Sequence, residues 1–238
     1  MSKELCFEAE NATKMRSNSH LWFELRYGRI TASILHEAAN CNTEDGSLVQ
    51  RITGASKVYD TKEMERGRCL EKEVLKKVEK IVGQKLKNCG LFLMPNYPIL
   101  GASPDAMGND FIVEVKCPNS DKAISRFPSK GKVASKCKAQ INLQILATNT
   151  KKGLFCVADP DFENNRKVTT VWVDYDKDYT TAVTEQAISF WKKNIYCAWR
   201  FIKAATIRTT MYGMMLWFKV ECGSKSENSR SLLITRST

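Results

Sequence analysis

A chain of 238 residues, 43% hydrophobic and 26% charged, has the length and composition of one globular domain, so disordered and membrane classes are not expected. Lys and Arg number 37 against 26 Asp and Glu, which gives a formal net charge of +11. A surplus of this size favours a polyanionic partner, with nucleic acid first and an anionic membrane surface second.

The cysteines do not indicate a zinc site or a disulfide framework. There are nine of them, with no C-x-x-C pair, and the chain has only two histidines. The odd count, the lack of a charged-then-apolar leader and the lack of a run of about 18 apolar residues predict a reducing, intracellular and soluble setting. Neither secretion nor membrane insertion is expected.

The chain begins with little pattern and then becomes regular. Residues 1–19 are polar and are predicted to form a weakly structured segment. The stretch ITASILHEAAN, at 30–40, predicts a helix that begins at a Thr31 cap, and turn residues at 42–47 end it.

The stretch RGRCLEKEVLKKVEKIVGQ, at 66–84, predicts the clearest early helix, ended by Gly83. One residue interrupts its apolar stripe. Glu71 shares a face with Leu75 and Val78, so its carboxylate is expected at or beside the buried surface.

Short apolar runs between turn residues predict the strands of a mixed sheet. They lie at 90–94, 98–103, 111–116, 153–159 and 168–175. Helices are predicted at 138–148 and from about 178 to 205. This order predicts an α/β (α+β) fold, with one domain at 20–204. The segment 205–238 is interpreted as a poorly ordered extension or an interaction segment.

Charged residues at the end of the third predicted strand indicate a catalytic site. Glu114 and Lys116 lie two apart and therefore project to the same side, and Asp105 lies in the turn before this strand. With Glu71, these carboxylates would repel one another unless a cation compensates. Oxygen ligands favour magnesium or manganese, and a lysine beside them suits metal-assisted hydrolysis of a phosphodiester.

A plainer interpretation of the same residues stays open. Asp105 would make only an Asx-turn, and Glu114 and Lys116 would be a solvated pair on an exposed sheet face. Likewise, Gln140 and Gln144 would form one solvated face of their helix.

Several motifs together resemble a known family. S-P-D at 103–105, followed by E-V-K-C-P at 114–118, looks like the core of the PD-(D/E)XK nuclease superfamily. WFELRYGRITAS at 22–33, GRCLE at 67–71 and AQINLQ at 139–144 occur in the order found in the lambda-exonuclease, or YqaJ-type viral recombinase, family. The resemblance covers about residues 20–200, and it implies a restriction-endonuclease-like core with a central mixed β-sheet flanked by helices.

The resemblance also implies roles for individual residues. The implied metal ligands, for Mg²⁺ or alternatively Mn²⁺, are Asp105, Glu114, the Val115 carbonyl and, directly or through water, Glu71. Lys116 would be the catalytic lysine.

Three further roles follow from the same resemblance. Gln140 would position the nucleophilic water or the lysine, and Arg26 and Ser33 would hold the 5′-phosphate of a DNA end. A Thr31 cap agrees with the last role, because it puts Ser33 in the first helical turn, where free N–H groups favour a phosphate. Plain capping by Thr31 and Ser33 is the alternative.

One residue departs from the family pattern. The family usually has glycine after S-P-D, whereas this chain has Ala106. If this position required a positive φ, alanine would strain the turn and displace Asp105.

A basic segment separates the predicted catalytic strand from the glutamine-bearing helix. It carries five cations and no acid, and these are expected to contact the DNA backbone, or else to form a solvated loop: Arg126, Lys130, Lys132, Lys136 and Lys138.

The predicted function is a metal-dependent deoxyribonuclease. The resemblance makes it a 5′-to-3′ exonuclease on double-stranded DNA ends, in recombination or end processing. It also implies a homo-oligomer and a single-strand annealing partner as candidates. The alternatives are a DNA-end or DNA-structure binding module that has lost turnover, and an endonuclease of the same superfamily.

Overall fold

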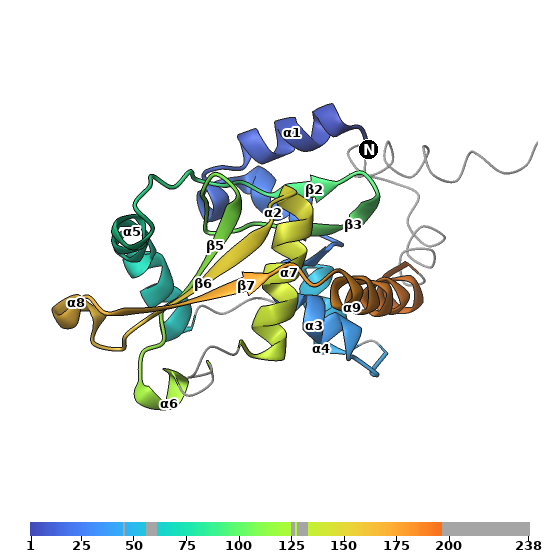
Figure 1. The fold of residues 1–238 in the computed structure, drawn as a ribbon. Coiled ribbons are helices and arrows are strands. Elements are labelled where there is room, and N and C mark those ends of the chain that lie inside the picture. Colours follow the sequence, from blue (N-terminus) through green and yellow to red (C-terminus); the bar gives the residue numbers. More distant parts are fainter. Residues whose placement is uncertain (45, 56–60, 125–126, 128–132, 197–238) are drawn as a thin grey trace, which may run out of the picture.

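The computed structural model describes residues 1–196 except 45, 56–60, 125–126 and 128–132 (Figure 1). Three of the predicted DNA-contacting cations, Arg126, Lys130 and Lys132, therefore lie outside the described residues. So do the end of the last predicted helix and the segment 205–238.

Helical elements dominate the chain up to residue 82, strands follow one another directly between 92 and 116, and helices and strands alternate only beyond residue 116. The helical elements are α1 (Lys3–Ala12), η1 (Arg16–Asn18), α2 (His20–Arg26), η2 (Ala32–Ile34), α3 (Leu35–Ala39), α4 (Ser47–Ile52), α5 (Lys62–Val82), α6 (Asp121–Ile124), α7 (Ser135–Thr148), α8 (Phe162–Asn165), α9 (Lys177–Phe190) and the π-helical η3 (Trp191–Tyr196). The strands are β1 (Ile30–Thr31), β2 (Phe92–Met94), β3 (Tyr97–Ala102), β4 (Ala106–Met107), β5 (Phe111–Lys116), β6 (Lys152–Ala158) and β7 (Val168–Asp174).

The strands form mixed sheets, as the apolar runs predicted, but they are divided between two sheets rather than gathered in one. One sheet has the order β1-β3-β2 and the other the order β4-β5-β6-β7. Within them, β1 pairs with β3 and β5 with β6 in parallel, and the remaining pairs are antiparallel. The S-P-D turn lies where the chain leaves β3 for β4, so Asp105 stands at the junction of the two sheets.

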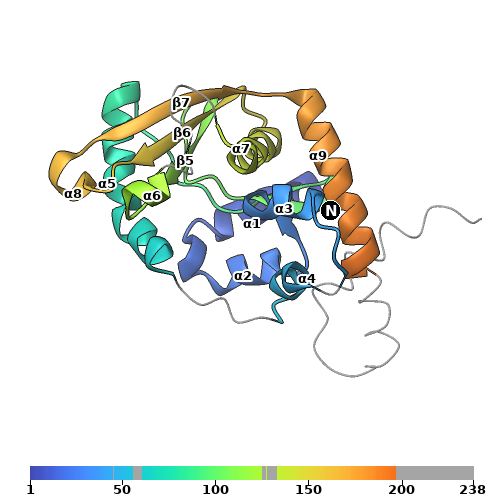
Figure 2. The same cartoon turned by 90° about the horizontal axis from the view of Figure 1, so that it is seen from below.

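Two helices cover opposite sides of the four-stranded sheet (Figures 1 and 2). The stripe of α5 that includes Leu70 and Val74 packs in one apolar cluster with Val113 of β5. On the other side, Ile141 of α7 packs in a cluster with Ile112. Alternate residues of β5 therefore face different helices, which is the arrangement that a strand buried on both sides requires.

The helix predicted at 66–84 is confirmed and begins earlier. Thr61 caps it by accepting a hydrogen bond from the Met64 amide, and Gly83 ends it with φ 69°. The prediction at 30–40 was right only in part, because Ile30 and Thr31 form the short strand β1 before the helical turn begins.

The prediction that residues 1–19 are weakly structured differs from the structure, where they form α1 and η1. The segment is fixed by polar contacts to the backbone before β2. Glu10 Oε1 accepts from the Gly90 amide at 3.0 Å, and Thr13 Oγ1 accepts from the Leu91 amide at 2.8 Å. A Cβ at Gly90 would lie 1.9 Å from the Glu10 carbonyl oxygen, so this close approach requires glycine.

No helix in the described part of the chain is both long and apolar enough to cross a membrane.

Candidate active site

The position of Asp105 is set by β5. Its backbone amide donates to the Val113 carbonyl at 3.0 Å, and its Oδ2 accepts from the Val115 amide at 2.7 Å. The backbone pairing of β4 with β5 ends at Ala106 and Val113, and beyond it the Asp105 side chain provides the acceptor for the next β5 amide, that of Val115. The interpretation of Asp105 as making only an Asx-turn is therefore wrong, because Oδ2 binds a backbone amide ten residues further on and Oδ1 binds Arg16.

Glu114 is the central carboxylate of the site. It is 3% exposed and faces α7, where Oε1 accepts from Gln140 Nε2 at 2.6 Å and Oε2 from Gln144 Nε2 at 2.7 Å. Lys116 Nζ lies 2.5 Å from Oε1. The interpretation of Glu114 and Lys116 as a solvated pair is therefore wrong, and so is the solvated face for the two glutamines.

Lys116 is held as a cation. Besides Glu114, its Nζ donates to Gln140 Oε1 at 3.3 Å. Burial alone would lower the pKa of Lys116, but the negative charges of Glu114 and Asp105 outweigh burial and raise it. The ammonium group consequently stays protonated throughout the neutral pH range.

Arg16 completes the cluster, and sequence reasoning missed it. Its guanidinium bridges two carboxylates, with Nη1 donating to Glu71 Oε1 at 2.6 Å and Nη2 to Asp105 Oδ1 at 2.7 Å. Burial would lower the pKa of Arg16, yet Asp105 and Glu71 raise it. The capping sequence that starts α1, with Ser2 accepting from the Leu5 amide, was the available signal that this segment is ordered.

The carboxylates are costly to ionise in this setting. Burial, followed by the charges of Glu114 and Glu71, raises the pKa of Asp105 to about 7. The pKa of Glu71 is raised as well, chiefly by burial, against the opposing effect of Arg16. The structure thus brings Glu71, Asp105, Glu114 and Lys116 together, as predicted.

The donor chemistry of this cluster fits a hard divalent cation. Three carboxylates and the Val115 carbonyl supply only oxygen, without histidine or thiolate. In the described part of the chain, however, no three acidic, histidine or cysteine side chains are gathered closely enough to hold a metal. The contacts explain why these carboxylates do not converge on one point. Arg16 is bound to Glu71 and Asp105, whereas Glu114 is directed toward α7.

Arg26 lies in a different environment near the same cluster. Its guanidinium stacks over the Trp22 ring, with Cζ 3.8 Å from the ring centroid. Burial and the charge of Arg16 lower the pKa of Arg26 to about 10. Among the described residues no carboxylate pairs with it. A desolvated cation without an anion is a favourable place for an incoming phosphate.

Ser33 lies in the short helical turn η2 that follows β1. Its Oγ is 3.2 Å from Thr31 Oγ1, and the side chain of Thr31 does not cap the helical turn. The pairing of Thr31 with Gly101 places this segment beside the strand that leads into the S-P-D turn.

Two of the predicted DNA-contacting lysines are described. Lys136 is exposed in the first turn of α7. Lys138 is already engaged, since its Nζ lies 2.7 Å from Asp176 Oδ2 and 4.3 Å from the centroid of the Tyr179 ring.

Ala106 does not strain the turn. It is not among the described non-glycine residues with positive φ, which are Arg16, Asn149 and Arg166. Ala106 instead lies in β4, where it pairs with Val113 of β5, and it is 1% exposed. Alanine in place of the family glycine is therefore compatible with the observed position of Asp105.

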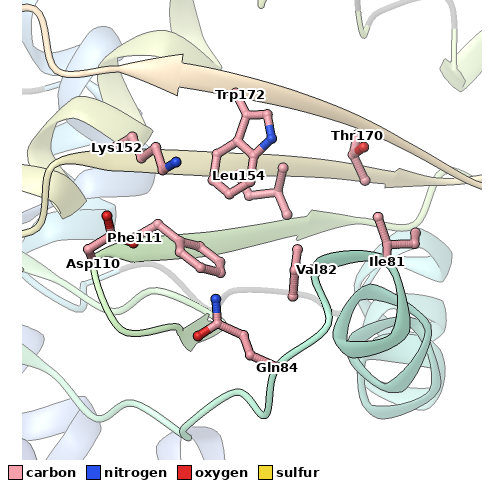
Figure 3. A pocket seen from close by; sticks show the side chains of 9 residues that line it. All are labelled: Ile81, Val82, Gln84, Asp110, Phe111, Lys152, Leu154, Thr170 and Trp172. Atoms are coloured by element: carbon pink, nitrogen blue, oxygen red, sulfur yellow. The ribbon is translucent and has the colours of Figure 1, made fainter.

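A cavity of about 210 Å³ lies at the other end of β5 (Figure 3). It is lined by Phe111, where β5 begins, by the end of α5 and by Trp172 of β7, over which Lys152 Nζ stacks at 4.3 Å. Because Lys116 ends the same strand, this cavity is separate from the carboxylate cluster.

The two mixed sheets, with helices on both sides of the larger one, have the architecture of the PD-(D/E)XK nuclease fold, and Asp105, Glu114 and Lys116 lie together within it. The sequence model of the YqaJ-like viral recombinase domain matches residues 21–151, more than half of the chain, so the chain belongs to that family. Comparison with curated proteins gave no match.

Solved structures share the fold at low sequence identity. An alkaline exonuclease from Laribacter hongkongensis is 22% identical, with a TM-score of 0.64 over 79% of this chain and 97% of that one. A phage-related exonuclease from Haemophilus somnus 129PT is 14% identical, with a TM-score of 0.53 over 71% and 96%. The shutoff and exonuclease protein of Kaposi's sarcoma-associated herpesvirus is 12% identical, with a TM-score of 0.54 over 80% and 72%.

Proposed function

We propose that this protein is a Mg²⁺- or Mn²⁺-dependent deoxyribonuclease that degrades double-stranded DNA from 5′ to 3′, starting at a phosphorylated end. The observation that carries the proposal is the convergence of Asp105, Glu114 and Lys116 at one end of β5. Arg26, which pairs with no carboxylate among the described residues, is close enough to Arg16 for their charges to interact.

The metal would be held by Asp105, Glu114 and the Val115 carbonyl, with Glu71 binding directly or through water. When bound, a divalent cation supplies Lewis-acid activation of the phosphate and of a water molecule. Lys116, kept protonated, acts by stabilising negative charge that develops on the phosphate oxygens rather than as a base. Gln140 donates to Glu114 and accepts from Lys116, so it fixes both side chains relative to each other.

Polarity would come from Arg26. A guanidinium can bind two phosphate oxygens at once, and this one is stacked on Trp22 and lacks a carboxylate among the described residues. Together with Ser33 it would hold the 5′-phosphate of an end. The polyanionic partner indicated by the net charge of +11 is then the DNA duplex.

Structural relatives are consistent with a nucleic-acid substrate. One structure of this fold, with a TM-score of 0.52 at 13% identity, is a complex of SOX with DNA, and another, with a TM-score of 0.54 at 11% identity, is a complex of SOX with RNA. A homo-oligomer and a single-strand annealing partner remain proposals that rest on the family.

The test is a comparison of substrates. Linear duplex labelled at either end, closed circular duplex and single-stranded RNA are incubated with Mg²⁺, Mn²⁺ or EDTA. We expect mononucleotide release from the 5′ end of linear duplex with metal only, and a loss of turnover on all substrates in Lys116→Ala. Equal cutting of closed circles would instead indicate an endonuclease, and full activity in EDTA would exclude the mechanism. Salt-dependent duplex binding without any turnover would indicate the binding module.

A further inference from the structure

The guanidinium of Arg16 lies between two of the carboxylates that are proposed to bind the metal. Two of the four proposed ligands, Glu71 and Asp105, each give it one oxygen, at 2.6 and 2.7 Å. The remaining Asp105 oxygen is bound by the Val115 amide, the residue whose carbonyl is a third proposed ligand. Arg16 therefore contacts the metal-binding side chains themselves rather than the periphery of the site.

These contacts are partly shielded from water. The exposed fraction of the side chain is 25% for Arg16, 27% for Glu71 and 10% for Asp105. Charge-assisted hydrogen bonds of this length in a partly desolvated site are strong, and a guanidinium and a divalent cation bound to the same two carboxylates would repel each other at close range. The two cations are therefore alternatives for this pair of carboxylates.

The backbone that carries Arg16 is unusual and firmly anchored. Arg16 has φ 49°, in the left-handed region that few residues other than glycine adopt. Just before it, Glu10 and Thr13 bind the backbone of residues 90 and 91. The N-terminal segment thus holds an uncommon conformation at the residue that it contributes to the carboxylate cluster, as expected where tertiary contacts determine it.

From these contacts we infer that Arg16 is a displaceable internal counter-ion, which neutralises Glu71 and Asp105 and must leave them before a divalent metal can load. This inference rests on the proposed metal-dependent function. If Arg16 and the metal compete for the same carboxylates, the apparent metal affinity depends on how strongly Arg16 is held. The N-terminal segment that carries Arg16 therefore sets the metal concentration at which the site is filled. Displacement also frees a guanidinium within electrostatic range of Arg26.

The primary test measures metal binding without DNA. Titration of MnCl₂ into the full chain by calorimetry, with free Mn²⁺ followed by electron paramagnetic resonance, compares wild type, Arg16→Gln and Arg16→Lys. Removing a competitor held by two charge-assisted bonds should tighten Mn²⁺ binding in Arg16→Gln by about tenfold or more, with Arg16→Lys in between. Arg51→Gln is the matched control, because Arg51 pairs with Glu37 at 2.5 Å and contacts none of the proposed ligands in the ion pairs of the described residues.

The outcomes separate this inference from the proposed function. Unchanged or weaker Mn²⁺ binding in Arg16→Gln overturns the counter-ion role, even if wild type hydrolyses DNA with metal. If Arg16→Gln loses DNA affinity but keeps wild-type Mn²⁺ affinity, Arg16 is a phosphate ligand instead. Tight metal binding that obeys the prediction without any hydrolysis would support the inference and reject the nuclease.

A second measurement uses wild type alone and covers the case in which the variant does not fold. The Arg16 amide donates to Thr13 O and the Ser19 amide to Arg16 O, both at 2.8 Å. On addition of MnCl₂, hydrogen exchange should become faster at 16–19 and slower at 113–116. Equal or slower exchange at 16–19 would show that the backbone which positions Arg16 does not loosen when the metal binds, and it would overturn the inference.

Discussion

Arg16 and Arg26 occupy neighbouring regions of one site under opposite electrostatic conditions. Both guanidinium groups are largely desolvated, but Arg16 bridges two carboxylates, which raise its pKa, whereas Arg26 stacks on Trp22 and its pKa falls to about 10. The difference shows that the same type of side chain is paired with carboxylates in one region and, among the described residues, with none in the other. The carboxylate region is therefore suited to exchange cations, and the Arg26 region to receive a phosphate.

The largest expected effect separates chemistry from end binding. Glu114→Gln should reduce hydrolysis by at least about a thousandfold, because a neutral amide is a poor ligand for a hard cation and would oppose the amide donors of Gln140 and Gln144. Single-turnover hydrolysis of end-labelled duplex measures this effect. Binding of 5′-phosphorylated duplex in EDTA should stay within about twofold of wild type. If end binding were lost as well, the two regions would not be independent.

Arg26→Ala addresses the other region. It should slow degradation of 5′-phosphorylated duplex about ten- to a hundredfold, since one charge-assisted contact worth about 1.5–3 kcal/mol is lost. The same duplex with a 5′-hydroxyl should be affected little, and Arg51→Ala serves as the surface control. Wild type that does not distinguish the two ends would remove the basis for assigning 5′-to-3′ polarity.

The pH dependence should also divide the two regions. With the pKa of Asp105 raised to about 7, its protonated form becomes the major one below that pH, and a protonated carboxyl does not bind a metal. Apparent Mn²⁺ affinity should therefore fall by up to about tenfold per pH unit below pH 7. Arg26, with a pKa of about 10, stays charged, so end binding in EDTA should change little over the same range. Calorimetry and fluorescence anisotropy measure the two quantities.

The smallest effect concerns the ring beneath Arg26. Trp22→Leu removes a cation–π contact worth about 0.5–1 kcal/mol, so the preference for a 5′-phosphate should fall about two- to fivefold. Trp22→Phe keeps an aromatic face and should lose less. Rates on both ends of the duplex give the ratio directly, and equal effects of Leu and Phe would argue against a role for the ring electrons.

The sequence predicted the carboxylate region better than its surroundings. The helix at 66–84 and the strand at 111–116 were predictable because their apolar periodicity is strong, and the motif spacing placed Glu71, Asp105 and Glu114. Arg16 was not predictable in this way, since its position depends on the close approach of α1 to Gly90, a long-range contact without local pattern. A solvated face for Gln140 and Gln144 stayed open from the sequence because α7 is polar where it covers Glu114, and only packing against the sheet shows that this face is buried.

Successive side chains of β5 face α7 and α5 in turn, and this alternation determines which mutations the site tolerates. Glu114 and Lys116 face α7, whereas Val113 and Val115 pack in the cluster formed with α5. Substitutions between apolar residues on the α5 side leave this division intact. Inserting or deleting one codon within 111–113 would exchange the two sides, placing the Glu114 carboxylate among apolar side chains and a valine against Gln140. In a library of single-codon insertions and deletions, this strand should therefore show almost no survivors, even where it accepts many substitutions.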